Sequence, residues 1–239
     1  MARRRAVHAS DPALGDGPDP VAHNTDVLLA QSSSVDNALH LEWVISRFLP
    51  CWGDRPAGFN IEFVEATTLA IINELERTGD TPALVALRGL ASVGSGRIAE
   101  ESAAAADRLA AGGVIAPPWA SQIGQATAVD ARIMRNDEDE SVGVLVEYAY
   151  PHGERHTLAA FIADDMGGAV KFMGLMKVID DACGDDNDDD ALPLQPIATD
   201  RAERLIRKAL EATDQVYARF DGDPSMREFG ALAWSRVRP

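Results

Sequence analysis

Apolar residues recur every three or four positions through the first half of the chain. In residues 34–49 this spacing places them on one face of a helix, with Ser34 as its cap and Pro50 at its end. The same spacing predicts helices over residues 60–78, 83–93 and 97–111, separated by turns that contain Gly or Pro. Four helices joined by short turns predict a helical lobe.

The pattern changes near residue 126 to the alternation that is typical of strands. Three runs rich in Val, Ile, Thr, Tyr and Phe follow, over residues 126–134, 142–150 and 155–163. A polar stretch joins the first two runs and a tight turn at residues 151–154 joins the last two, which predicts an antiparallel three-stranded meander. Both faces of the middle strand carry apolar residues, so we expect helices to flank the sheet.

The rest of the chain is predicted to be helical. Residues 167–179 are apolar nearly all round, which predicts a buried helix that begins at Gly167-Gly168. Further helices are predicted from Thr199 or Asp200 and from Pro224. The predicted fold class is α+β, with an N-terminal helical lobe, a central three-stranded antiparallel meander and C-terminal helices.

The pattern also predicts how the chain is divided. Residues 1–25 have almost no large apolar side chains and are predicted to be a disordered tail. Residues 26–119 form the helical lobe, and residues 120–239 form an α+β region with the antiparallel sheet and the C-terminal helices. Whether these two parts make one domain or two stays open.

The charge balance restricts the partners that we expect. Among 239 residues, 38 acidic and 22 basic side chains give a net charge of −16, which predicts no binding to nucleic acid or to anionic membranes. A basic protein partner or a homo-oligomer is compatible with this charge. The two cysteines, Cys51 and Cys183, form no CxxC pair, and no secretion signal follows the basic start, so we expect a cytoplasmic protein.

Candidate chemistry concentrates after the third predicted strand. Asp164 and Asp165 precede Gly167 and Gly168, and His156 lies on the same strand. The carboxylates could bind a divalent cation and the glycines could let a ligand approach backbone N–H groups, but capping of the predicted helix by either aspartate explains the same residues and is favoured.

The other acidic and histidine patterns predict no metal site and no cofactor. The acidic run at residues 185–190 resembles the first half of a calcium-binding loop, but Asp190 and Pro196 occupy positions that require Gly and Glu. That run and residues 137–140 are therefore interpreted as solvated loops. His152 is followed by Gly153, so its four-residue spacing to His156 lacks the helical zinc motif.

Four segments resemble a set of uncharacterised proteins from high-GC actinobacteria. They are Leu109-Ala-Ala-Gly-Gly-Val-Ile-Ala-Pro-Pro-Trp119, Val146-Glu-Tyr-Ala-Tyr150, His156-Thr-Leu158 and Ile162-Ala-Asp-Asp-Met-Gly-Gly168. The resemblance covers about residues 80–180. It implies a bacterial cytoplasm and brings no activity with it.

These observations predict a nonenzymatic cytoplasmic interaction or regulatory protein. The alternative is a metal-dependent hydrolase that uses Asp164 and Asp165, with His156 if strand curvature brings it near. A concave pocket that gathers these side chains would favour the hydrolase, and their separation at the surface would favour the interaction protein.

Overall fold

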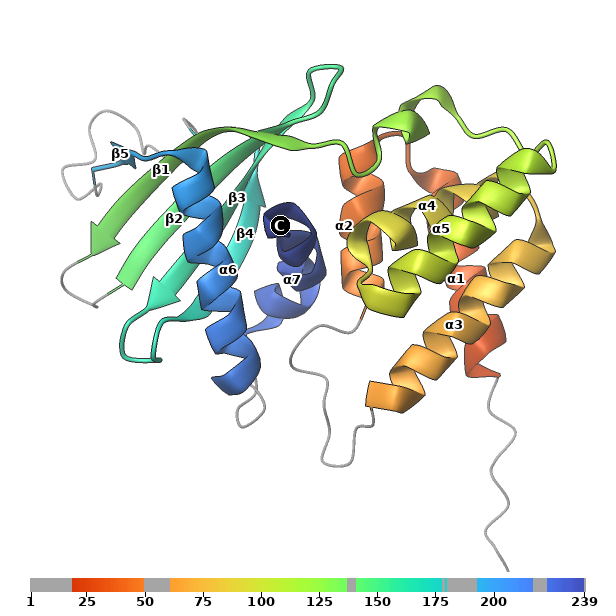
Figure 1. Cartoon of the computed structure of the whole chain (residues 1–239), viewed down its shortest axis with the longest axis horizontal. Coiled ribbons are helices and arrows are strands. Elements are labelled where there is room, and N and C mark those ends of the chain that lie inside the picture. Colours follow the sequence, from red (N-terminus) through yellow and green to blue (C-terminus); the bar gives the residue numbers. More distant parts are fainter. Residues whose placement is uncertain are drawn as a thin grey trace, which may run out of the picture.

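The computed structural model describes residues 19–49, 61–136, 141–177, 179, 193–216 and 223–238. These residues form seven α-helices, one short 3-10 helix and five strands, so the predicted α+β class is confirmed. Helices α1 to α5 make a lobe on one side of the molecule, and the sheet lies on the other side with α6 and α7 against it (Figure 1). Residues 50–60, 137–140 and 180–192, which include Cys51, Cys183 and both acidic runs, lie outside the description.

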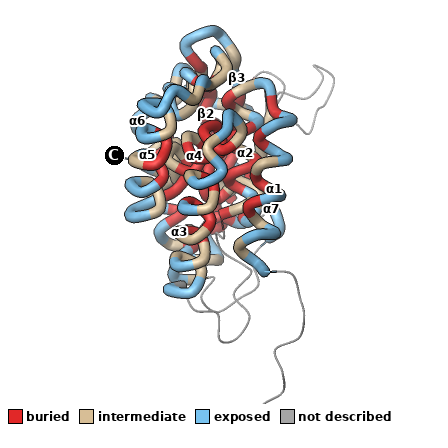
Figure 2. The backbone as a smooth tube through the Cα atoms, turned by 90° about the vertical axis from the view of Figure 1, so that its right-hand side faces the viewer, coloured by how far each residue is buried: buried red, intermediate tan, exposed pale blue. Residues whose placement is uncertain are grey.

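The helical lobe is built from α1 (Pro20–Ser34), α2 (Ala38–Phe48), α3 (Ile61–Thr78), α4 (Thr81–Val93) and α5 (Gly96–Ala111). Helix α4 is apolar on most sides, and its residues Leu84, Leu87 and Leu90 are fully buried. It contacts the other four helices of the lobe, so it is the central helix. Figure 2 shows the buried residues running through the interior of the molecule, with the exposed residues on the outer faces of the helices.

The start of the lobe differs from the prediction. Helix α1 already begins at Pro20, with Asp19 as its N-cap, so residues 20–25 are helical although they were assigned to the tail. Helix α1 has few apolar side chains, but its Leu28 is fully buried in the core of the lobe. The composition of the segment alone does not show this contact with the rest of the lobe. The cap of the next helix is Asn37 rather than Ser34, which lies in the last turn of α1.

The sheet contains more than the predicted meander. Strands β1 (Thr127–Asn136), β2 (Ser141–Ala149) and β3 (Arg155–Ala163) are antiparallel neighbours, as expected. Strands β4 (Ala169–Met176) and β5 (Gln195–Pro196) extend this sheet at its two edges, which gives the order β4-β3-β2-β1-β5. Helices α6 (Thr199–Val216) and α7 (Pro224–Val237) cover one face, where they enclose a core with Val144, Val146 and Leu158.

The helix predicted from Gly167 is wrong, because this segment is strand β4. A run that is apolar on all sides fits a buried strand as well as a buried helix, and here the turn decides. Gly167 and Gly168 have φ values of 69° and 81°, in the left-handed region that favours glycine, and the Gly168 N–H donates to the Ala163 carbonyl at 3.0 Å. The chain therefore reverses and β4 pairs with β3, with a bulge opposite Phe161 and Ile162.

The outer edge of β4 is blocked by hydroxyl groups of the two covering helices. The Val170 N–H donates to Thr213 Oγ1 of α6 at 2.9 Å, and the Met173 N–H donates to Ser225 Oγ of α7 at 3.0 Å. An edge strand with paired N–H groups is a poor template for addition of another strand. These bonds also attach α6 and α7 to the sheet.

We expect Ser225→Ala to lower the free energy of unfolding by about 1 to 3 kcal/mol, because the buried Met173 N–H loses its acceptor. Urea denaturation measures this change, and amide hydrogen exchange at Met173 should become faster. Ser235→Ala is the matched control, since the Ser235 hydroxyl only donates to the Leu232 carbonyl of the same helix. Its effect should stay within about 0.5 kcal/mol, and equal effects of the two variants would refute the edge-blocking role.

Candidate functional site

The sequence-predicted aspartates and glycines lie in the turn between β3 and β4. Asp164 and Asp165 are exposed there, and the next regular element is a strand. The favoured interpretation, in which an aspartate caps a following helix, is therefore wrong. Gly167 and Gly168 serve the reversal of the chain.

His156 lies at the other end of β3, near its start, and is buried on the sheet face that α6 and α7 cover. Asp164 is eight positions further along the chain, a span of roughly 26 Å at about 3.3 Å per residue. The structure does not bring His156 together with Asp164 and Asp165. Within the described ranges, no three His, Cys, Asp or Glu side chains gather as a metal ion would require.

His156 instead belongs to a buried polar cluster that joins the helical lobe to the sheet. At its centre, Arg236 of α7 forms an ion pair with Glu42 of α2. Only 4% of the Arg236 side chain and none of the Glu42 side chain are exposed. Burial alone would lower the pKa of Arg236, but the charge and hydrogen bond of Glu42, together with the neighbouring Tyr150 and Tyr148, outweigh burial and the pKa is raised.

Further hydrogen bonds satisfy both oxygens of the Glu42 carboxylate. Oε1 accepts the Gly124 N–H at 2.6 Å and the Ser92 hydroxyl at 3.2 Å. Oε2 accepts from the Tyr150 hydroxyl as well as from Arg236, and Arg236 also donates to the Tyr150 oxygen at 2.7 Å. A buried charge requires this degree of pairing, because desolvation is costly.

Aromatic rings complete this cluster on the sheet side. The His156 ring lies 5.6 Å from the Tyr148 ring and 5.6 Å from the Tyr150 ring, between centroids. Arg236 Nε donates to His156 Nε2 at 3.4 Å, while His156 Nδ1 has no hydrogen-bond partner among the described residues. Burial, followed by the charge of Arg236, lowers the pKa of His156 to about 3. Burial raises the pKa of both tyrosines.

The geometry of this cluster supports a structural role. Its members come from α2, α7, β2 and β3, so their bonds fix the lobe against the sheet and α7 between them (Figure 1). The sequence pattern indicated His156 as a companion of Asp164 and Asp165, and it did not indicate Glu42, Tyr150 or Arg236. The available signal was Glu42, a charged residue between the apolar Leu41 and Val44 of the helical stripe, because unpaired charges are rarely buried.

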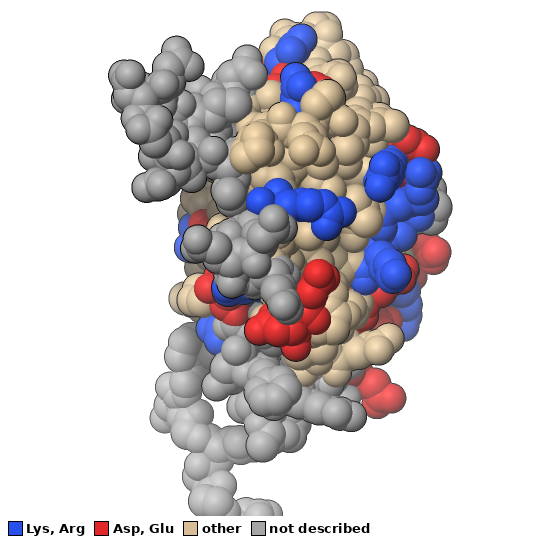
Figure 3. Space-filling view, turned by 90° about the vertical axis from the view of Figure 1, so that its left-hand side faces the viewer, with Lys and Arg blue, Asp and Glu red and all other residues tan. Residues whose placement is uncertain are grey.

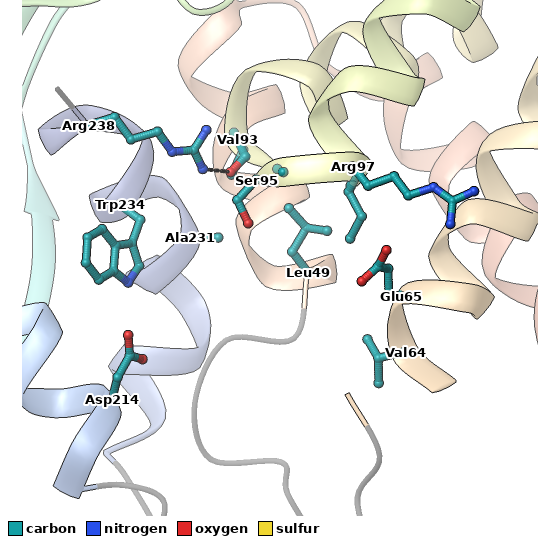
Figure 4. Close-up of a pocket in the computed structure, with 13 residues that line it drawn as sticks. Leu49, Val64, Glu65, Val93, Ser95, Arg97, Asp214, Ala231, Trp234 and Arg238 are labelled. Atoms are coloured by element: carbon teal, nitrogen blue, oxygen red, sulfur yellow. Dashed lines mark hydrogen bonds between the residues drawn. The ribbon is translucent and has the colours of Figure 1, made fainter. Parts of the chain in front are cut away.

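An open groove lies at the same junction, between the lobe and the C-terminal helices. It encloses about 580 Å³ and is lined by Leu49, Val64, Glu65, Val93, Gly94, Ser95, Gly96, Arg97, Ile98, Asp214, Ala231, Trp234 and Arg238. Figure 4 shows Trp234 and Ala231 of α7 on one side, with Leu49 and Ser95 of the lobe facing them. Arg238 crosses from one wall to the other and donates to the Val93 carbonyl at 2.9 Å.

Charged groups surround the apolar floor of this groove. Leu49, Val93 and Ala231 are buried, whereas Arg97 and Asp214 are exposed and Glu65 is half-buried. Arg97 is 3.8 Å from Glu101 and stays largely in solvent. An apolar floor with a charged rim is an arrangement that is common in protein-binding surfaces.

The surface around α6 and the sheet has mixed charge. Lys and Arg side chains gather along one border of this face with Asp and Glu side chains between them, and a large uncharged area lies beside them (Figure 3). Arg201, Arg204 and Lys208 of α6 are exposed, but Arg204 is paired with Asp200 at 2.6 Å.

Comparisons with known proteins return no match: no family model, no curated protein and no solved structure is similar to this chain at the significance required. In the described part of the chain, no helix has the length and apolar character needed to cross a membrane.

We expect Glu42→Gln and Arg236→Met each to lower the free energy of unfolding by about 3 to 5 kcal/mol, because each leaves a buried charge without its partner. The double variant should cost clearly less than the sum of the two. Urea denaturation of the four proteins measures this coupling. Glu74→Gln and Arg77→Met are the control pair, since this ion pair lies at the surface and should contribute at most about 1 kcal/mol. If the change in unfolding free energy of the double variant equals the sum of the two single changes, Glu42 and Arg236 do not stabilise each other and the structural role of the pair is wrong.

We expect the stability of the protein to fall as the pH decreases from about 6.5 towards 3. In that window the unfolded chain protonates His156, whereas the folded protein keeps it neutral because its pKa is about 3. His156→Phe retains a ring and removes the titration, so its unfolding free energy should depend less on pH. Urea denaturation between pH 7 and 4.5 tests this.

The control for this pH series is His152→Phe, because His152 is exposed in the turn before β3. Its pH profile should run parallel to that of the wild type. If His156→Phe also runs parallel to the wild type, His156 does not carry the pH dependence.

Proposed function

We propose that this chain is a noncatalytic binding protein that holds an apolar segment of a partner protein in the groove between the lobe and α7. The observation that carries the proposal is the groove itself. Its volume of about 580 Å³ is within the range of ligand sites, and Leu49, Val93 and Ala231 give it an apolar floor. When apolar side chains of a partner bind there, they and the floor are removed from water. This burial stabilises the complex by about 25 cal/mol per Å² of apolar surface.

The rim explains how a partner segment would be oriented. Arg97 and Arg238 offer donors to carbonyl or carboxylate groups, and Glu65 and Asp214 offer acceptors to backbone N–H groups or basic side chains. Trp234 adds a large, partly buried ring to one wall. Buried aromatic side chains of this kind contribute much of the binding energy of protein interfaces.

Binding is favoured over catalysis by the separation of the groove from the polar cluster. The side chains with the strongly shifted pKa values, His156, Tyr148 and Tyr150, do not line the groove. Groups with strongly shifted pKa values are frequent in catalytic sites, where they lie within reach of the bound substrate. The hydrolase alternative has less support, because His156 lies near the start of β3 whereas Asp164 lies in the turn after its end.

Selection of peptides from a random displayed library tests the proposal. We expect peptides enriched on the wild-type protein to contain adjacent apolar residues and to lose at least about tenfold in affinity for Ser95→Trp, a difference of about 1.4 kcal/mol. Ser95 is exposed at the groove and its side chain makes no capping bond, so tryptophan can fill the space without disturbing α5. Fluorescence anisotropy of labelled peptides measures the affinity.

Ser33→Trp provides the matched control, because Ser33 is an exposed serine on α1, away from the groove-lining residues. It should bind the selected peptides as the wild type does. The proposal is rejected if no peptide is enriched, or if the selected peptides bind Ser95→Trp and the wild type equally.

A further inference from the structure

A second groove lies between α2, the turn that precedes β3, strand β4 and α7. It is shallow and open to solvent, with a volume of about 420 Å³, and is lined by Asn37, Leu39, His40, Trp43, Glu154, Leu175 and Phe229. It shares no lining residue with the larger groove. Its properties can therefore be considered and tested independently of the proposed function.

The walls of this second groove are apolar and held in place. Leu39, Trp43, Leu175 and Phe229 are all half-buried. The Trp43 indole N–H donates to Glu228 at 3.1 Å, and the guanidinium group of Arg47 lies 5.0 Å from the Trp43 ring centroid. A ring fixed by two contacts loses little conformational entropy when a ligand packs against it.

The charge in the second groove is negative. Glu154 is half-buried and has no ion pair among the described residues. Burial, then the charges of Asp36 and Glu42, raise the pKa of the Glu154 carboxyl. Among the described lining residues only His40 can carry a positive charge.

We infer that the second groove binds a lysine or arginine side chain from a basic segment of a partner protein. The aliphatic stem of that side chain packs against Trp43, Leu175 and Phe229, and its cationic group pairs with Glu154. The net charge of −16 attracts such a segment at longer range.

The charge of the groove selects this occupant over others. An acidic segment would meet repulsion from Glu154 and Asp36. An uncharged apolar side chain would bury the Glu154 carboxylate further without giving it a partner, which is unfavourable. A second copy of this chain carries the same negative net charge, so its approach is opposed at long range.

Four short peptides, identical except at their centre, test the inference. They have the form acetyl-Gly-Leu-X-Leu-Gly-amide, with X as arginine, lysine, norleucine or glutamate. Binding is followed by the NMR signals of the Trp43 indole N–H and the Leu175 methyl groups. We expect the arginine and lysine peptides to bind at least about fivefold more tightly than the norleucine peptide, and less tightly as NaCl is added.

Glu154→Gln should lower the affinity for the arginine peptide by at least about fivefold, since the amide keeps the shape and removes the charge. Glu100→Gln, an exposed carboxylate on α5, is the control and should leave this affinity unchanged, as should Ser95→Trp in the larger groove. Equal binding of the norleucine peptide, tighter binding of the glutamate peptide, or absence of saturable shifts at Trp43 and Leu175 would overturn the inference. None of these results bears on peptide binding in the larger groove.

Discussion

The buried ion pair between Glu42 and Arg236 is the interaction on which the arrangement of the molecule depends. The two residues are 194 positions apart in the sequence, one on a helix of the lobe and one on the last helix. Because neither charge is reached by water, each must be paired, and the pairing geometry fixes α2 relative to α7. Tyr150, the residue directly after β2, hydrogen-bonds to both partners, so the same constraint positions the end of β2 as well.

Helix α7 consequently has a neighbour on each side. It packs on the sheet through Met226, Ala233 and Val237, and on α2 and α4 of the lobe through Ala231. Small residues permit this close approach, and the Leu232 N–H lies 3.0 Å from Ser46 Oγ of α2. The two grooves are each lined partly by α7, one through Ala231, Trp234 and Arg238 and the other through Phe229. A rigid helix thus contributes to both candidate binding surfaces, which reduces the entropy that binding costs.

The polar cluster also carries a cost that depends on conditions. His156 is buried beside a cation, and in the described part of the chain its Nδ1 has no hydrogen-bond partner. The ring of this histidine packs against two tyrosine rings. In mild acid, however, His156 is protonated only in the unfolded chain, so a fall in pH lowers the free energy of unfolding. The cluster that joins the lobe to the sheet therefore makes the stability of the protein depend on pH.

The sequence by itself determined the elements whose signals are local. The three- and four-residue spacing of apolar residues located α2 to α5, and the alternation in residues 126–163 located β1 to β3. Two helix boundaries follow from the backbone preferences of single residues. Pro224 stands at the start of α7, and Gly79, with φ 69°, follows the end of α3. His156 was selected for the site, but as a companion of Asp164 and Asp165 rather than of Arg236.

Only the tertiary structure decided β4, the beginning of α1 and the identity of the buried cluster. An all-apolar segment can bury itself as a helix or as a strand, and the turn at Gly167-Gly168 together with the free edge of β3 selected the strand. Helix α1 has a weak apolar stripe and depends on the lobe core around Leu28. Glu42 and Arg236 look like surface charges in the sequence, because the free energy that permits their burial comes from each other, and no local pattern records a partner so distant along the chain.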